Sequence, residues 1–139
     1  MSTIEVHIVS AEKEIFSGEV NAVFASAEVG EVGIFPQHAP FLSTLKPGEV
    51  RVRVDGQPDE HFFVSGGIIE VQPEVVTILS DTAERGADLD EAKAQAARQR
   101  AEDALQTQLS DVEAAKAMAE LAAAAAQLRM IEELRRKVK

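Results

Sequence analysis

The sequence has 139 residues, a length typical of one compact domain or of a small domain with an appendage. Its apolar content of 45% is enough for a core, but only 4% of the residues are aromatic, so that core must be mainly aliphatic. The net charge of −10 argues against binding to nucleic-acid phosphates, and the absence of cysteine excludes disulfides, thiolate metal sites and thiol catalysis.

The first part of the chain has the pattern of short β-strands separated by turns. Apolar and polar side chains alternate in residues 4–8 and 50–54, which predicts strands with one buried and one wet face. Further β-branched runs follow at residues 60–64, 68–71 and 75–80, between turn signals at residues 46–48, 55–56, 66–67 and 72–74. This spacing predicts a β-sandwich or a barrel. The opening residues lack the layout of a signal peptide and no apolar run is long enough to span a membrane, so we expect a soluble protein.

The pattern changes to that of helices in the last third of the chain. Two capping boxes mark the expected helix starts, Asp88 with Glu91 and Ser110 with Glu113. They predict helices over residues 89–107 and from 111 to about 137. The segment between the two helices is short, so we expect an antiparallel hairpin.

The charge changes at the same point as the periodicity. Residues 1–86 carry 14 acidic and 5 basic side chains, whereas residues 87–139 carry 10 acidic and 9 basic ones. The coincidence of the two changes predicts a domain boundary, with one domain at 1–86 and a second at 87–139.

The expected faces of the hairpin are rich in alanine where a stable pair of helices would have leucine. These alanines are Ala92, Ala96, Ala97, Ala104, Ala115, Ala119, Ala122, Ala123 and Ala126. Exchanging a buried Leu for Ala loses on the order of 2 kcal/mol per site, although alanine is the best helix former. Two interpretations remain open at this point: an ordinary alanine-rich coiled-coil pair, or a hairpin built to open.

No pattern of catalytic residues is present in the sequence. Phosphate-binding, dinucleotide-binding, zinc-protease and serine-hydrolase motifs are all missing, and the three histidines, His7, His38 and His61, are far apart. His38 lies on backbone that Pro36 and Pro40 stiffen, without a recognisable carboxylate to orient it as a base. We therefore predict neither an enzyme nor a metal site, and interpret this loop as a recognition surface.

Several ordered blocks carry a resemblance to a known family. They are G-E-V-G-I-F-P-Q-H-A-P (30–40), K-P-G (46–48), V-S-G-G-I-I-E-V (64–71), V-T-I-L (76–79), D-L-D-E-A-K-A (88–94) and A-Q-L-R (126–129). Together they make nearly the whole chain resemble the ε subunits of bacterial F-type ATP synthases. The resemblance implies an N-terminal ten-stranded β-sandwich and a C-terminal antiparallel two-helix hairpin. It also implies a non-catalytic central-stalk subunit that couples proton-driven c-ring rotation to ATP synthesis and inhibits ATP hydrolysis through its helices.

The resemblance assigns partners to particular residues. The sandwich is expected to contact the γ subunit through Pro36, His38 and Pro40, and the c-ring loops near Gly30 and Glu31. The helices are expected to contact the catalytic α and β subunits through Arg129, Arg135, Arg136 and Lys137. Such a chain would lie at the cytoplasmic face of the bacterial inner membrane, held there only through the complex.

Some members of this family also bind ATP through an [I/L]-D-x-x-R-A motif. Here Leu89, Asp90 and Ala94 match, but Lys93 replaces the arginine and lacks its bidentate fork. The second-helix arginines of strong binders are replaced as well, by Ala123 and Gln127. We therefore expect no cofactor, and weak ATP binding at most. An unrelated sandwich-plus-coiled-coil adaptor of another complex remains the alternative.

Overall fold

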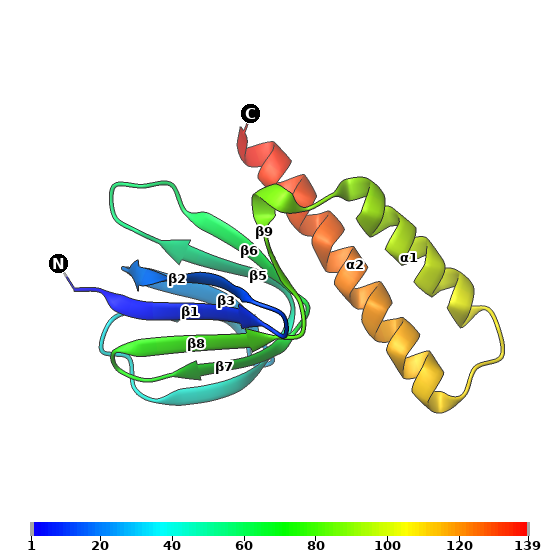
Figure 1. The fold of residues 1–139 in the computed structure, drawn as a ribbon, viewed down its shortest axis with the longest axis horizontal. Helices are drawn as coiled ribbons and strands as arrows, with labels where there is room; N and C mark the ends of the chain where they lie inside the picture. Colours follow the sequence, from blue (N-terminus) through cyan, green and yellow to red (C-terminus); the bar gives the residue numbers. More distant parts are fainter. Residues whose placement is uncertain (1, 139) are drawn as a thin grey trace. The chain divides into compact units, whose positions relative to one another are not determined.

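The chain divides into two compact units, residues 1–87 and residues 88–139. The computed structural model describes the backbone of residues 2–138 and the side chains of residues 2–136. The first unit contains the strands and the second contains a pair of helices (Figure 1). The predicted fold class, a β-sandwich followed by a helical hairpin, is confirmed.

Nine strands form the first unit in the described part of the chain. They are β1 (Ile4–Ser10), β2 (Glu14–Val20), β3 (Ala22–Ala27), β4 (Gly30–Ile34), β5 (Phe41–Arg53), β6 (Glu60–Val64), β7 (Gly67–Val71), β8 (Val75–Ser80) and β9 (Ala83–Arg85). One layer has the order β2-β1-β8-β7-β5 and the other contains β9, β6, β5, β3 and β4, so β5 belongs to both. All the pairings are antiparallel except that of β1 with β8.

The strand count differs from the expected ten because β5 continues through the predicted turn at residues 46–48. The N-terminal part of β5 pairs with β7 up to Leu45, and its C-terminal part pairs with β6 from Gly48 onward. The register with β3 shifts between the same two parts. Pro47 therefore lies where neither ladder needs its missing N–H, which is where a strand tolerates proline. Counting the two parts of β5 separately restores ten.

The core of the sandwich is aliphatic, as the composition predicted. The alternation in β1 and in the second part of β5 turns Ile4, Val6, Val50 and Val52 inward, where each is at most 1% exposed. Phe62 is the aromatic member of this cluster. The hydrophobic cluster is made wholly of residues from the strand unit, so this unit has a core of its own.

The second unit is an antiparallel pair of helices, α1 (Glu91–Leu105) and α2 (Asp111–Val138), preceded by the short 3₁₀ helix η1 (Gly86–Asp88) (Figure 1). The predicted capping box at α2 is confirmed, because the N–H of Ser110 donates to Glu113 at 3.2 Å and the N–H of Glu113 donates to the Ser110 hydroxyl oxygen at 3.2 Å. The hydrogen bonds from Ser110 also hold the pKa of Glu113 below its usual range. Neither helix is long and apolar enough to cross a membrane.

The predicted cap of α1 was placed two residues too early. Asp90, and not Asp88, is the N-cap, and its carboxylate accepts the N–H of Lys93 at 3.2 Å. Asp88 instead belongs to η1. Aspartate is favoured as an N-cap at either position. Asp88 is part of the 3₁₀ helix, so the α-helix begins after Asp90.

The alanines that pack the hairpin are mostly not the ones predicted. Ala94 and Ala101 are the buried residues of α1. On α2, Ala117 and Ala124 are buried and lie, by helical spacing, on the same side as Arg135, which contacts α1. The predicted Ala126 is buried too, but on the opposite side of the helix. Five of the predicted alanines are exposed instead: Ala92, Ala96, Ala115, Ala119 and Ala122. With alanine on every side of a helix, composition does not reveal which face packs.

Candidate functional site

The turn between β3 and β4 forms an exposed tip on the sandwich. Val29 is 78% exposed there, and Glu31 is exposed beside it. Gly30 has a φ of +121°, which a residue with a side chain rarely adopts. The N–H of Glu28 donates to the carbonyl of Thr44 at 3.0 Å and ties the turn to β5. The predicted residues Gly30 and Glu31 thus lie on a fixed protrusion.

The loop with the two prolines lies at the other end of β4. Pro36 and Gln37 form a turn, with Gln37 at a φ of +67°, and the N–H of Gln37 donates to the carbonyl of Pro73 at 2.9 Å. The His38 ring is 2.7 Å from the carbonyl of Ala39 through Nδ1, which therefore donates. These contacts and the two prolines restrict the backbone conformations that the loop can adopt. Because β4 separates them, Pro36, His38 and Pro40 do not form one site with Gly30 and Glu31.

An open hollow of about 510 Å³ borders this loop, but its polar groups are engaged in the fold. Asn21 donates from Nδ2 to the carbonyl of Ser2 at 3.1 Å and accepts the N–H of Asp55 at 2.7 Å. The guanidinium of Arg53 pairs with Asp59 at 3.3 Å. The hollow therefore presents few free polar groups that would orient a small molecule.

Three large apolar side chains are exposed on the outer face of the first layer, and sequence reasoning missed them. They form what we call the apolar strip: Leu42 (69% exposed), Ile68 (45%) and Leu79 (51%). Ile68 and Leu79 are direct partners across β7 and β8, while Leu42 pairs with Glu70, two residues along β7 from Ile68. A signal was present, because apolar residues occupy consecutive positions in both strands where one wet face requires alternation.

The close pairing of β7 with β8 depends on a glycine. Gly67 has a φ of +131°, and a Cβ at this position would overlap the carbonyl oxygen of Leu79. Without a side chain here, β7 approaches β8 closely enough to set Ile68 beside Leu79. Apolar side chains gathered on one exposed sheet face are typical of a protein–protein contact.

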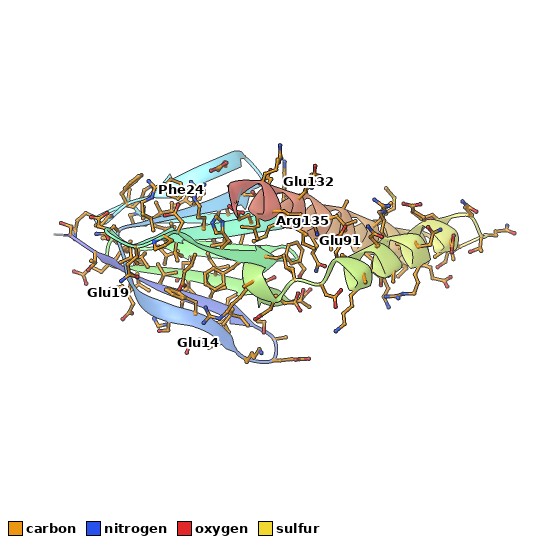
Figure 2. The ribbon with its side chains drawn as sticks, turned by 90° about the horizontal axis from the view of Figure 1, so that it is seen from above. Glu14, Glu19, Phe24, Glu91, Glu132 and Arg135 are labelled. Carbon is orange, nitrogen blue, oxygen red and sulfur yellow. The ribbon has the colours of Figure 1, made fainter. Side chains whose placement is uncertain are left out.

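A charged cluster lies on the same sheet face as the apolar strip. His7 of β1 is adjacent to Thr77 of β8, two residues from Leu79. Its Nδ1 is 3.1 Å from Glu14 and its Nε2 is 3.0 Å from Glu5. Both carboxylates raise the pKa of His7, Glu14 most strongly, while burial opposes them. Figure 2 shows Glu14 and Glu19 along the edge strand β2.

The described residues do not assemble a metal site, and those of the degenerate ATP motif lie at the start of α1. No group of three or more histidine or acidic side chains there has the arrangement needed to hold a metal ion. In the degenerate ATP motif, Asp90 caps α1, Ala94 is buried, Leu89 is half-buried and Lys93 is exposed. The hydrogen bond that Asp90 makes as the cap of α1 accounts for its position.

The basic residues predicted to contact a partner lie in the last third of α2. Arg129, Arg135 and Arg136 are exposed, and the side chain of Lys137 lies outside the described ones. Arg135 donates to the carboxylate of Glu91 at the start of α1, and Figure 2 shows the two residues close together. Glu91 raises the pKa of Arg135 further. Within residues 2–136, neither Arg129 nor Arg136 forms an ion pair.

Two family models together match almost the whole chain. The model described as the ATP synthase delta/epsilon chain β-sandwich domain matches residues 3–86. The model described as the ATP synthase delta/epsilon chain long α-helix domain matches residues 87–132.

Curated relatives of similar length are highly similar in sequence. The chain is 60% identical to an ATP synthase epsilon chain of Nitrosococcus oceani over 137 residues, which are 98% of this chain and 97% of the relative. It is 58% identical to that of Thioalkalivibrio sulfidiphilus over 135 residues, 96% of each chain.

The fold is also similar to chains of two solved complexes. One is a chain of the Euglena gracilis mitochondrial ATP synthase (OSCP/F1/c-ring), with a TM-score of 0.77, 21% identity, and coverage of 91% of this chain and 79% of that one. The other is a chain of the Tetrahymena thermophila mitochondrial ATP synthase central stalk and c-ring, with a TM-score of 0.63, 16% identity and coverage of 96% of each chain.

Proposed function

Because the chain belongs to the family of ATP synthase delta and epsilon chains, we propose that its strand unit anchors it to the rotary complex and its helical unit regulates that complex. The predicted family is confirmed, and with it the role of a non-catalytic accessory subunit of the central stalk. The chain therefore associates with the ATP synthase complex. We propose a separate partner for each of three surfaces of the chain.

The apolar strip is the proposed contact with the γ subunit, and it is the observation that carries the proposal. Leu42, Ile68 and Leu79 expose about half or more of their surface to water. Burial in an interface would remove this apolar surface from water, which is favourable. Leu42 follows Pro40 by two residues, so the stiff loop with Pro36 and His38 continues the same surface. A rigid loop and a flat sheet lose little conformational entropy on binding.

The exposed tip with Gly30 and Glu31 is the proposed contact with the loops of the c-ring. It lies at the opposite end of β4 from the stiff loop, so one strand unit can bridge two partners. Bound in this way, the chain would be peripheral to the membrane, at the cytoplasmic face of the bacterial inner membrane. Its contact with the membrane would be only through the complex.

The helical unit is the proposed regulator of ATP hydrolysis. Its exposed basic residues, Arg129, Arg135 and Arg136, together with Lys137, are proposed to contact the catalytic α and β subunits. Charge on such a surface acts at long range and is screened over roughly 10 Å at 0.1 M salt. Inhibition of ATP hydrolysis by the chain should therefore weaken as salt rises.

The test compares the affinity of two variants for a catalytic head that contains γ. Ile68→Glu places a charge in the apolar strip, whereas Gln57→Glu adds the same charge at an exposed turn on the other layer. We expect Ile68→Glu to weaken binding about tenfold or more and Gln57→Glu to leave it unchanged, because buried anchors dominate interface energetics. Equal affinities would remove the strip from the interface. Failure of the wild-type chain to bind the head would contradict the proposed anchoring.

A further inference from the structure

The apolar contact within the hairpin comes from side chains that are either small or only half-buried. The buried residues of α1 are Ala94 and Ala101, and each contributes a single methyl group. The buried residues of α2 on the side of Arg135 are alanines as well, Ala117 and Ala124. Three larger side chains lie on the same side by helical spacing, Leu121, Leu128 and Ile131, and they are only half-buried. The closed pair therefore leaves part of its apolar surface in contact with water.

The pair of Glu91 with Arg135 joins the two helices where the loop does not. Glu91 is the first residue of α1, and Arg135 lies in the last turn of α2. The connecting loop, residues 106–110, holds the other end of the hairpin covalently. An antiparallel pair that separates must open from its free end, and this ion pair lies at that end.

The same guanidinium also belongs to the basic surface proposed to contact the catalytic subunits. Glu91 occupies one terminal nitrogen of the Arg135 guanidinium, so a second carboxylate cannot take the paired, bidentate position that includes this nitrogen. While Arg135 is bound to Glu91, its charge is partly neutralised and its orientation is fixed. Contact with an acidic partner therefore competes with closure of the hairpin.

We propose that Glu91 is a latch residue, whose ion pair with Arg135 holds the hairpin closed and withholds Arg135 from the partner complex. The claim that the pair withholds Arg135 from a partner rests on the proposed function. The claim that the pair holds the hairpin closed does not. The side chains of Glu91 and Arg135 are 41% and 60% exposed, so the pair is accessible to a competing carboxylate. For an exposed pair, loss of the contact should raise the ratio of open to closed hairpin by about two- to fivefold at low salt.

The chain has no cysteine, so two introduced cysteines give a clean distance measurement. Ala92→Cys and Glu133→Cys lie at exposed positions near the free end of the hairpin and accept spin labels. Pulsed electron resonance on the full-length labelled protein then yields the fractions of short and long distances. Glu91→Gln should raise the long-distance fraction, and Arg135→Glu should raise it further by placing like charges together.

A double variant with the two charges exchanged distinguishes the effect of the ion pair from the other effects of each substitution. Glu91→Arg and Arg135→Glu each place a charge that the helix dipole disfavours, and the double variant carries both penalties. Recovery of the short distance in the double variant therefore reports the pair itself. Arg136→Glu makes the same charge change one residue further along and serves as the matched control. Circular dichroism of every variant confirms that both helices remain.

Two results overturn the latch. The long-distance fraction could stay unchanged in Glu91→Gln and Arg135→Glu, or Arg136→Glu could raise it as much as Arg135→Glu does. A parallel measurement of ATP hydrolysis by the catalytic head addresses the proposed function separately. Glu91→Gln should strengthen inhibition, because it frees Arg135. If the distances respond and inhibition does not, the latch stands and the regulatory proposal fails.

Discussion

At the scale of single residues, the fold stabilises the protonated, charged form of His7. Only the imidazolium has two N–H groups, so only the charged ring donates to both Glu14 and Glu5, which lie within 3.1 Å. The neutral ring would leave a lone pair against one carboxylate. The pKa of His7 in the folded protein is therefore raised above its ordinary value of 6.5.

This arrangement predicts a pH dependence of stability. Because the folded pKa lies above the unfolded one, the contribution of His7 is complete below pH 6.5 and is lost as the pH rises through the folded pKa. Denaturant unfolding of the wild type should show stability decreasing above pH 6.5, and the His7→Gln variant should lack that decrease. NMR titration of the His7 ring gives the folded pKa directly. Identical pH profiles for the two proteins would contradict the account.

Gln37 has a backbone conformation that is unfavourable for most residues. Its φ of +67° is a left-handed conformation that glycine adopts freely and a β-branched residue does not. Gln37→Val should lower the free energy of unfolding by about 1–2 kcal/mol, whereas Gln37→Gly should leave it within about 1 kcal/mol of the wild type. Thermal unfolding measures both. Gln72→Val, at an exposed position with an ordinary φ, is the control and should have little effect.

At the scale of elements, strand positions were predictable where one face is buried and the other wet. The alternation around Val50 and Val52 gave a correct strand because only one register buries both valines. The K-P-G signal at residues 46–48 marked the right place, but it predicted a turn where β5 continues and changes its partner from β7 to β6. That change of pairing is a tertiary feature, which local sequence does not specify. The apolar strip was missed because Ile68 and Leu79 look like core residues within their own strands.

For the helices, the sequence predicted their existence but not which alanines pack between them. Their existence followed from caps and propensity, and the Ser110 cap was placed correctly. The identity of the packing alanines did not follow, because alanine occurs on every side of both helices and does not single out one face. The contact between Glu91 and Arg135, 44 residues apart, depended on which faces pack and was therefore not predicted.

The start of α1 also leads to a prediction about ATP. The carboxylate of Asp90 is engaged by the N–H of Lys93, and lysine does not supply the bidentate fork of the arginine in the [I/L]-D-x-x-R-A motif. We expect calorimetry with the full chain to show no ATP binding tighter than the millimolar range. Micromolar binding would mean that Lys93 and other groups replace the missing arginines.

At the scale of the whole molecule, the two units differ in charge, periodicity and core. The hydrophobic cluster consists entirely of residues from the strand unit. Residues 1–87 should therefore fold without the helices. A fragment of these residues is expected to unfold cooperatively on heating and to retain the circular dichroism of a β protein. A disordered fragment would show that the helical unit is required for the sandwich to form.

The central claim is that anchoring and regulation reside in separate units of one chain. The most direct measurement is ATP hydrolysis by a γ-containing catalytic head saturated with either the full chain or residues 1–87, with the affinity of each measured in parallel. The account predicts affinities that agree within about threefold, because both proteins contain the apolar strip, and inhibition by the full chain only, decreasing with salt. Equal inhibition by the two proteins, or failure of residues 1–87 to bind the head, would contradict it.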